Sequence, residues 1–397
     1  MSKFDLGIIN GKVYDSFYNK FQYKDIGIID GKITYLKNRS NSRIEAAKTI
    51  EAHGMYITPS LIDAHTHIYN YATPLGVDHT LLARRTGGGV FVDAGSSGVH
   101  NFLGFQKFII EKTEFHLYAF LNVCCNGLVS LGCAPGVGEL QDIRLININA
   151  SKKIIDKYSE SIVGVKVRID KLAIGNNWEQ AIDSAVELSS ACQKPLMVHI
   201  AGDGTTIERL LPKLRKGDIL SHIFRGPPNC TVTDDGKVKD CMYAARERGV
   251  LLDMAHGLGS MSFDVANTYI MNKFYPDIIS SDVHSACVDQ PARDLVTTMS
   301  KMLNIGMPIE DIVAATTIKP AKALNIDAKH GKIEIGRAAD LSLFSIKDGS
   351  FIFYDRLSSK TFKKNISSQI GIINGKVFRV DALLKADINI NCSVFRK

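Results

Sequence analysis

Short apolar runs alternate with amphipathic stretches through the middle of the chain. Several runs are separated by stretches of helical periodicity, such as residues 178–193 and 240–249. Apolar strands that alternate with amphipathic helices indicate a parallel sheet covered on both faces. The eight runs of strand length are 57–68, 88–97, 116–125, 162–169, 195–202, 218–226, 251–259 and 277–285.

Eight strand–helix units over about 230 residues predict an α/β fold, a (β/α)8 TIM barrel, whose typical size is ~250 residues. A doubly wound open sheet is the alternative. It is disfavoured because no glycine-rich phosphate loop follows the first run.

A seven-residue pattern pairs the two ends of the chain. It reads GIINGKV at 7–13, GIIDGKI at 27–33 and GIINGKV at 371–377. Asn-Gly or Asp-Gly between β-branched runs is the strongest short signal for a tight hairpin, because both turn residues need positive φ. Three unrelated hairpins would give the same pattern. The simpler interpretation is a small β-sandwich domain built from residues 1–57 and 335–390, with residues 58–334 left for the barrel.

The composition is that of an ordinary globular enzyme. Of 397 residues, 45% are hydrophobic and 22% are charged. No apolar stretch approaches the ~18 to 20 residues of a membrane span, and the first residues lack a secretory pattern. We therefore expect a cytoplasmic protein with no membrane partner. The eight cysteines form no CxxC pair and are expected to be reduced.

The net charge of +7 is spread along the chain, so no nucleic-acid partner is expected. It weakly favours an anionic small substrate.

Polar side chains interrupt the apolar runs close to their carboxyl ends, where a barrel of this type carries its active site. Residues His65 and His67 lie on the same side of one strand, since side chains alternate with period two. Each polar group needs a partner in an otherwise apolar strand. The full set is His65, His67, Lys166, His199, His222 and Asp282.

At this point the sequence resembles the amidohydrolase superfamily, and within it the dihydroorotase-like metallohydrolases of the deacetylase-like branch. The matching segments are PSLIDAHTHI, GVKVRI, PLMVHI, DILSH, ISSD and TTIKPAKALNI leading into GKIEIGRAADLSLF. The resemblance spans nearly the whole chain. It implies a binuclear zinc site whose two Zn²⁺ ions are bridged by an N6-carboxylated Lys166. It assigns His65, His67 and Asp282 to the more buried ion, and His199 and His222 to the more exposed one.

This site implies a binuclear zinc amidohydrolase that cuts a C–N or ester bond. A free lysine ammonium would repel two dications, whereas a carbamate bridges them. A hydroxide shared by the zinc ions would attack the carbonyl, and Asp282 would carry its proton to the leaving group. Manganese, cobalt or iron could fill similar nitrogen and oxygen sites.

The substrate is predicted to be a small acylated carboxylic acid. Dihydroorotases have an arginine two residues after the HxH pair, where this chain has Tyr69. Period two places Arg168 on the side of Lys166, where it could clasp a carboxylate, although a structural ion pair is an equal alternative. Further contacts are expected from the glycine-rich segment after the seventh run and from the eighth run, namely His256, Gly257, Ser260 and His284.

Three other functions remain open. One is a cyclic amidase of the hydantoinase or dihydroorotase type, another is a mononuclear deaminase, and the third is a non-catalytic homologue. A homo-oligomer is common in the family. The five remaining histidines are expected at the surface or in loops, and these are His53, His79, His100, His116 and His330.

Overall fold

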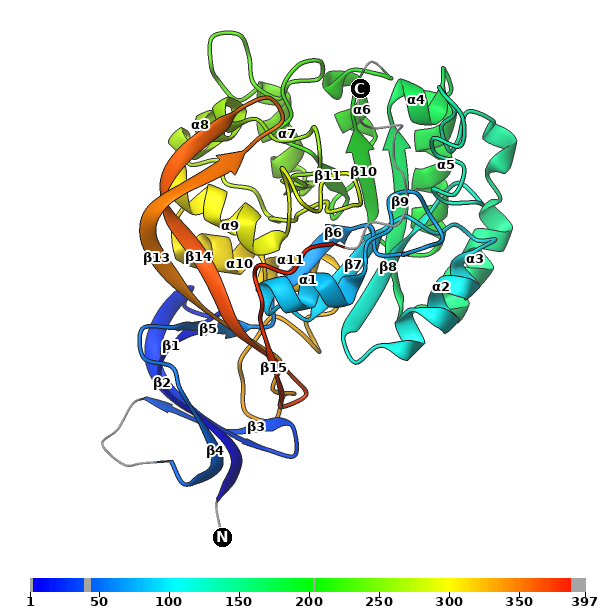
Figure 1. The fold of residues 1–397 in the computed structure, drawn as a ribbon. Coiled ribbons are helices and arrows are strands. Elements are labelled where there is room, and N and C mark those ends of the chain that lie inside the picture. Colours follow the sequence, from blue (N-terminus) through cyan, green and yellow to red (C-terminus); the bar gives the residue numbers. More distant parts are fainter. Residues whose placement is uncertain (1–2, 39–43, 203, 387–397) are drawn as a thin grey trace.

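The computed structural model describes residues 3–38, 44–202 and 204–386. Residues 387–390 of the predicted sandwich domain lie outside these ranges. The chain forms a seven-stranded parallel sheet and a separate eight-stranded mixed sheet (Figure 1). Cys392 also lies outside the described ranges, and the seven cysteines within them are unpaired.

The parallel sheet confirms the predicted barrel. Its strands follow one another in sequence order, because each helical crossover returns the chain beside the strand it left. Every residue of β6 and β7 is buried, as expected for strands covered on both faces, including the polar residues Asp63, His65 and Asp93. The strands are β6 (Ile62–Thr66), β7 (Val90–Ala94), β8 (His116–Asn122), β9 (Ile162–Ile169), β10 (Leu196–Ile200), β11 (Ile219–Ser221) and β12 (Leu251–Asp253).

The eighth predicted run closes the barrel as an irregular segment. Residues 277–283 make two isolated parallel bridges, Asp253–Ile278 to β12 and Thr66–Val283 to β6. The amide of His67 donates to the carbonyl of Val283 over 3.0 Å. Asp282 has φ 46°, in the left-handed region, so it breaks the regular strand at the position predicted to carry catalysis.

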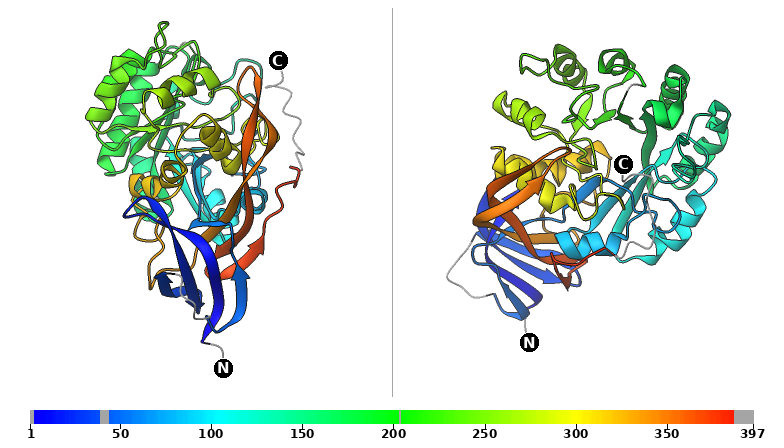
Figure 2. Two further views of the ribbon diagram at one scale, coloured as in Figure 1. Left: turned by 90° about the vertical axis from the view of Figure 1, so that its left-hand side faces the viewer. Right: turned by 45° about the horizontal axis from the view of Figure 1, so that its top comes forward.

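Helices surround the barrel strands (Figure 2). The predicted helix at 178–193 is α5, whose buried residues Ala181, Ala185 and Leu188 recur at helical spacing. Among the described residues, no helix has the length and apolar character needed to cross a membrane. The helices are α1 (His79–Thr86), α2 (Phe102–Phe108), α3 (Ile148–Lys157), α4 (Lys171–Ile174), α5 (Trp178–Ala191), α6 (Ile207–Leu210), α7 (Asp240–Glu247), α8 (Phe263–Met271), α9 (Leu295–Asn304), α10 (Ile309–Ala315) and α11 (Ile318–Ala323).

The mixed sheet joins the two ends of the chain and fits the predicted β-sandwich. Strand β5 pairs in parallel with β1 and antiparallel with β13, so it links the N-terminal and C-terminal strands. The long β13–β14 ribbon runs up beside the barrel, where β14 packs against α9 (Figure 1). The strands are β1 (Phe4–Asp15), β2 (Lys20–Ile29), β3 (Lys32–Asn38), β4 (Ala46–Glu51), β5 (Tyr56–Pro59), β13 (Leu341–Tyr354), β14 (Ser359–Ile373) and β15 (Lys376–Arg379).

Two of the three predicted hairpin turns are confirmed and the first is wrong. Asp30-Gly31 and Asn374-Gly375 have positive φ at both positions and connect paired strands. The first copy instead lies within β1, where a bulge falls between Ile8 and Gly11. A Cβ on Gly11 would lie 2.3 Å from Ile57 Cδ1, so glycine there permits close packing rather than a turn.

Candidate functional site

A cavity of about 400 Å³ opens at the carboxyl ends of the barrel strands. Five of the six predicted metal-binding residues line it, together with Arg168, Ser260 and His284. The sixth, His222, is buried directly beside it and contacts His199. Strand β11 ends at Ser221, so His222 follows the strand, whereas the sequence pattern predicted that it lies within the strand.

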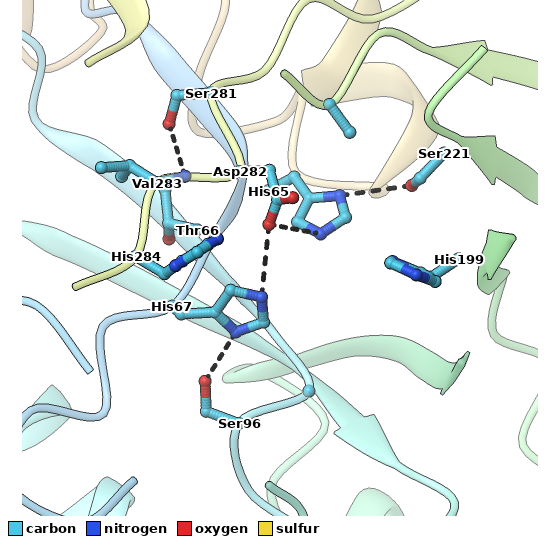
Figure 3. A network of polar contacts seen from close by, with 12 residues as sticks. His65, Thr66, His67, Ser96, His199, Ser221, Ser281, Asp282, Val283 and His284 are labelled. Atoms are coloured by element: carbon cyan, nitrogen blue, oxygen red, sulfur yellow. Dashed lines mark hydrogen bonds and ion pairs between the residues drawn. The ribbon is translucent and has the colours of Figure 1, made fainter. Parts of the chain in front are cut away.

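His65, His67 and Asp282 meet at one point. The Nε2 atoms of His65 and His67 each lie 3.3 Å from Asp282 Oδ1. Figure 3 shows both rings pointing at this carboxylate, with His199 across the cluster. The backbone amide of Asp282 donates to the carbonyl of His65 over 2.7 Å, which ties the irregular eighth segment to β6. Three potential metal ligands from segments far apart in the sequence therefore lie side by side.

The outer nitrogens of both rings are held by other side chains. His65 Nδ1 lies 3.2 Å from Asp253 Oδ2, and His67 Nδ1 lies 3.0 Å from Ser96 Oγ. These contacts orient each ring so that Nε2 faces Asp282, as ligating histidines require. Burial, followed by the Lys166 charge, lowers the pKa of His65. Burial favours a higher pKa for Asp282, but the surrounding imidazoles hold the pKa of that carboxyl well below its usual range.

Lys166 of β9 is fully buried beside this group. Its Nζ lies 3.3 Å from His65 Nε2. Burial lowers the pKa of Lys166 to about 7. A Cβ on Gly95 would lie 2.6 Å from Lys166 Cγ, so the glycine leaves space for the lysine side chain. The packing around Lys166 thus accommodates a buried lysine, which is uncommon in proteins.

His199 and His222 form the second half of the cluster. His222 Nδ1 donates to the carbonyl of Ala255 over 2.8 Å, so its Nε2 carries a lone pair. That Nε2 lies 2.6 Å from His199 Nδ1 and 3.9 Å from Asp282 Oδ2. Burial lowers the pKa of His222 to about 3 and lowers the pKa of His199 well below its usual value. Among the described residues, His199 Nε2 has no hydrogen-bond partner, although it lies 3.5 Å from Asp170 Oδ2.

The donor set fits divalent metal ions. Within the described part of the chain, His65, His67 and Asp282 form a group whose ligand atoms lie within 4.8 Å of one another. Burial keeps both imidazoles of the second pair neutral, and neutral imidazole nitrogens with a carboxylate are the ligands that zinc accepts. A cation between His199 and His222 would also satisfy nitrogen atoms that now face each other.

Arg168 is already paired with two carboxylates. Its Nη1 lies 3.3 Å from Glu139 Oε2 and its Nη2 lies 3.2 Å from Asp170 Oδ2. Burial favours a lower pKa for Arg168, but Glu139 and then Asp170 raise it. This arrangement matches the structural alternative and argues against the predicted clasp for a substrate carboxylate. Glu139 was not detectable from sequence because it comes from a long loop with no periodic signal.

The four other predicted contacts divide into two pairs. Ser260 and His284 line the cavity, and burial lowers the pKa of His284 to about 4. His256 and Gly257 are not among its lining residues. Instead His256 Nε2 lies 2.6 Å from Nζ of the buried Lys301 in α9. Gly257 packs directly behind Asp282, where a Cβ would lie 2.3 Å from Asp282 Oδ2.

A separate histidine cluster lies at the opposite end of the barrel. His116, the first residue of β8, bonds Asp340 at 2.9 Å, and His330 Nε2 bonds the Tyr118 hydroxyl at 2.8 Å. His79 begins α1 and is only 8% exposed, so its predicted position at the surface or in a loop is wrong, whereas His330 lies in a loop, as predicted, but is only 4% exposed. Each is buried because it has a polar partner, which the sequence did not reveal.

Known proteins share this architecture and much of this sequence. A model of the Amidohydrolase family matches residues 56–378. The relative "Deacetylase Atu3266" from Agrobacterium fabrum (strain C58 / ATCC 33970) is 32% identical over 319 residues, which cover 80% of this chain and 77% of that protein.

Two solved structures are similar over 95% of this chain. The crystal structure of an adenine deaminase has a TM-score of 0.87 at 26% identity and is covered completely, at 100%. The crystal structure of a dihydroorotase has a TM-score of 0.85 at 29% identity and is covered to 99%. With a family model that spans both the barrel and parts of the mixed sheet, this chain belongs to the Amidohydrolase family.

Proposed function

We propose that this chain is a deacetylase-like, metal-dependent hydrolase that cleaves an amide or ester bond in a small acylated carboxylic acid. The observation that carries the proposal is the single cluster formed by His65, His67, Asp282, Lys166, His199 and His222. Membership of the Amidohydrolase family supports a hydrolase. The similarity to a protein named deacetylase supports the type of reaction.

In this proposal the cluster holds two zinc ions. His65, His67 and Asp282 would hold the inner ion, and His199 and His222 would hold the outer one. A carboxylated Lys166 would complete the ligand set, because its Nζ lies beside His65 Nε2 and a carbamate adds two oxygen ligands. Bound divalent ions would supply a water nucleophile near neutral pH and Lewis acidity toward the scissile carbonyl.

Asp282 is the proton carrier of the proposed reaction. Its Oδ1 faces His65 and His67, while its Oδ2 lies 3.9 Å from His222 Nε2, so the carboxylate spans both halves of the cluster. From this position it accepts a proton from the attacking water and returns it to the leaving nitrogen or oxygen. A cytoplasmic location and a homo-oligomeric state remain sequence-based predictions.

Tyr69 supports an acyclic substrate over a dihydroorotase-type one. Its hydroxyl donates to the carbonyl of Asn101 over 3.1 Å, and its ring packs against Phe105 with centroids 4.7 Å apart. Tyr69 is not among the residues that line the cavity. It therefore does not substitute for the arginine that binds the substrate carboxylate in dihydroorotases.

Metal content and intact mass test the proposed site. Protein purified with bicarbonate should contain two zinc ions per chain and lose the mass of one CO₂ on mild acid treatment. Lys166→Gln should lack that acid-labile mass. One metal and no added mass would contradict the bridged site and favour a mononuclear deaminase.

Product analysis tests the reaction itself. The metal-loaded enzyme should split N-acyl or O-acyl acids into two products. Ring opening of hydantoins or dihydroorotate, with one product, would favour a cyclic amidase. Release of ammonia from adenine would favour a deaminase. A fully loaded protein that turns over none of these compounds would favour a non-catalytic homologue.

A further inference from the structure

A second guanidinium lines the cavity, and among the described residues no carboxylate pairs with it. Arg225 lies three residues after His222, and its amide donates to the carbonyl of His222 over 3.1 Å. The only side-chain hydrogen bond of Arg225 within the described ranges runs from Nη1 to Ser260 Oγ, over 3.2 Å. Its Nε is buried and has no hydrogen-bond partner in the part of the chain that the structure describes.

The surroundings of Arg225 disfavour an unaccompanied cation. Burial lowers the pKa of Arg225 and the charge of Arg356 lowers it further, while the Asp170 carboxylate, which forms no ion pair with Arg225, opposes both effects only in part. The Arg356 guanidinium is held by the backbone, since its Nη1 donates to the carbonyl of Pro227 over 2.9 Å. A buried donor without a partner is unfavourable, so an anion in the cavity would be stabilised there.

Arg168 shows the opposite arrangement in the same cavity. Glu139 and Asp170 both contact its guanidinium, so its donors and its charge are satisfied by the protein. Of these two arginines in the cavity, Arg225 is therefore the one with capacity left for a ligand. The volume of about 400 Å³ suits a small molecule.

We infer that Arg225 binds the carboxylate of the acylated substrate, with the Ser260 hydroxyl beside it, while the acyl group lies at the His65–Asp282 cluster. This inference rests on the proposed function and names its specificity-determining residue. A planar guanidinium offers two parallel N–H donors that match a carboxylate. The enzyme then selects acylated acids over their neutral counterparts, because a neutral amide leaves the guanidinium unpaired.

Matched substrate pairs test this role. The probes are N-acetyl amino acids, each as the free acid and as its carboxamide, assayed with metal-loaded wild type, Arg225→Met and Arg225→Lys. Arg225→Met should lower kcat/KM for the free acid about 100-fold and leave the carboxamide nearly unchanged. Arg225→Lys should recover part of the preference for the acid. Arg356 neighbours Arg225 but does not line the cavity, so the Arg356→Met variant should keep the preference for the free acid.

Calorimetric titration of the same acids provides a readout that does not depend on turnover. The free acid should bind wild type more tightly than Arg225→Met, with equal metal content in both. An unchanged acid-to-amide ratio in an active Arg225→Met would overturn the inference and leave the proposed function standing. If wild type hydrolyses neither these probes nor the corresponding O-acyl acids, the proposed function fails. Acid binding that is insensitive to Arg225 would overturn the inference separately.

Discussion

Gly257→Ala is expected to inactivate the enzyme by displacing Asp282. Gly257 has φ 55°, and a Cβ there would lie 2.3 Å from Asp282 Oδ2. Its amide donates to the carbonyl of Ser281 over 2.9 Å, so the backbone is held in place and the carboxylate must give way. Because real Cβ atoms stay at least 3.0 Å from such neighbours, the oxygen must move by about 0.7 Å or more.

A displacement of this size is large for a metal ligand. Ligand distances are normally held within about 0.2 Å, and a misplacement of about 1 Å lowers rates on the order of 100-fold. We therefore expect kcat/KM to fall about 100-fold, with a lower metal content per chain. The assays are steady-state hydrolysis of an acylated acid, metal analysis of the purified variant and a denaturant titration.

Two glycine controls separate the possible causes. Gly259→Ala changes the same loop, but no heavy atom lies within 4 Å of its Cβ position, so activity should stay within about threefold of wild type. Gly54 has φ 76° and no heavy atom within 4 Å of its Cβ position, so Gly54→Ala measures the effect of backbone strain alone. That strain is about 1–2 kcal/mol and should leave kcat/KM unchanged. A folded Gly257→Ala enzyme as active as Gly259→Ala would refute the reasoning.

Two further predictions concern buried charge. Burial lowers the pKa of His330 from 6.5 to about 3. Between these values the unfolded chain binds a proton that the folded chain does not, so stability is complete above pH 6.5 and falls as the pH drops toward 3. At roughly 1.36 kcal/mol per pH unit, about 2 kcal/mol is lost by about pH 5. Denaturant titrations should show a shallower slope in His330→Gln than in wild type and in the exposed control His53→Gln, because other buried histidines also contribute; parallel curves for all three would be inconsistent with it. Lys301→Met removes the ammonium that lies 2.6 Å from His256 Nε2, and we expect about 3 kcal/mol of destabilisation, because buried acceptors lose their donor. The exposed Lys322→Met should change the urea midpoint little, and an equally small change for Lys301→Met would count against this role.

Local periodicity predicted the barrel and the core of the site. Apolar runs separated by amphipathic helices are a property of neighbouring residues, so the strands of the parallel sheet were found in the correct order. The side-chain alternation within a strand likewise placed His65 and His67 on one face, and the structure brings both to Asp282. Two Asn-Gly or Asp-Gly turns were correct because their φ preference is local.

Contacts between distant segments were decided only by the tertiary structure. Asn10-Gly11 has the same local preference as the two true turns, but close packing against Ile57 makes it a bulge within β1. The partners of Arg168 and the isolation of Arg225 depend on which loops meet at the rim of the barrel. Sequence periodicity specifies the face on which a side chain lies within its own element. Which charges meet across loops depends on long-range packing that has no period along the chain, so their pairing followed only from the folded structure.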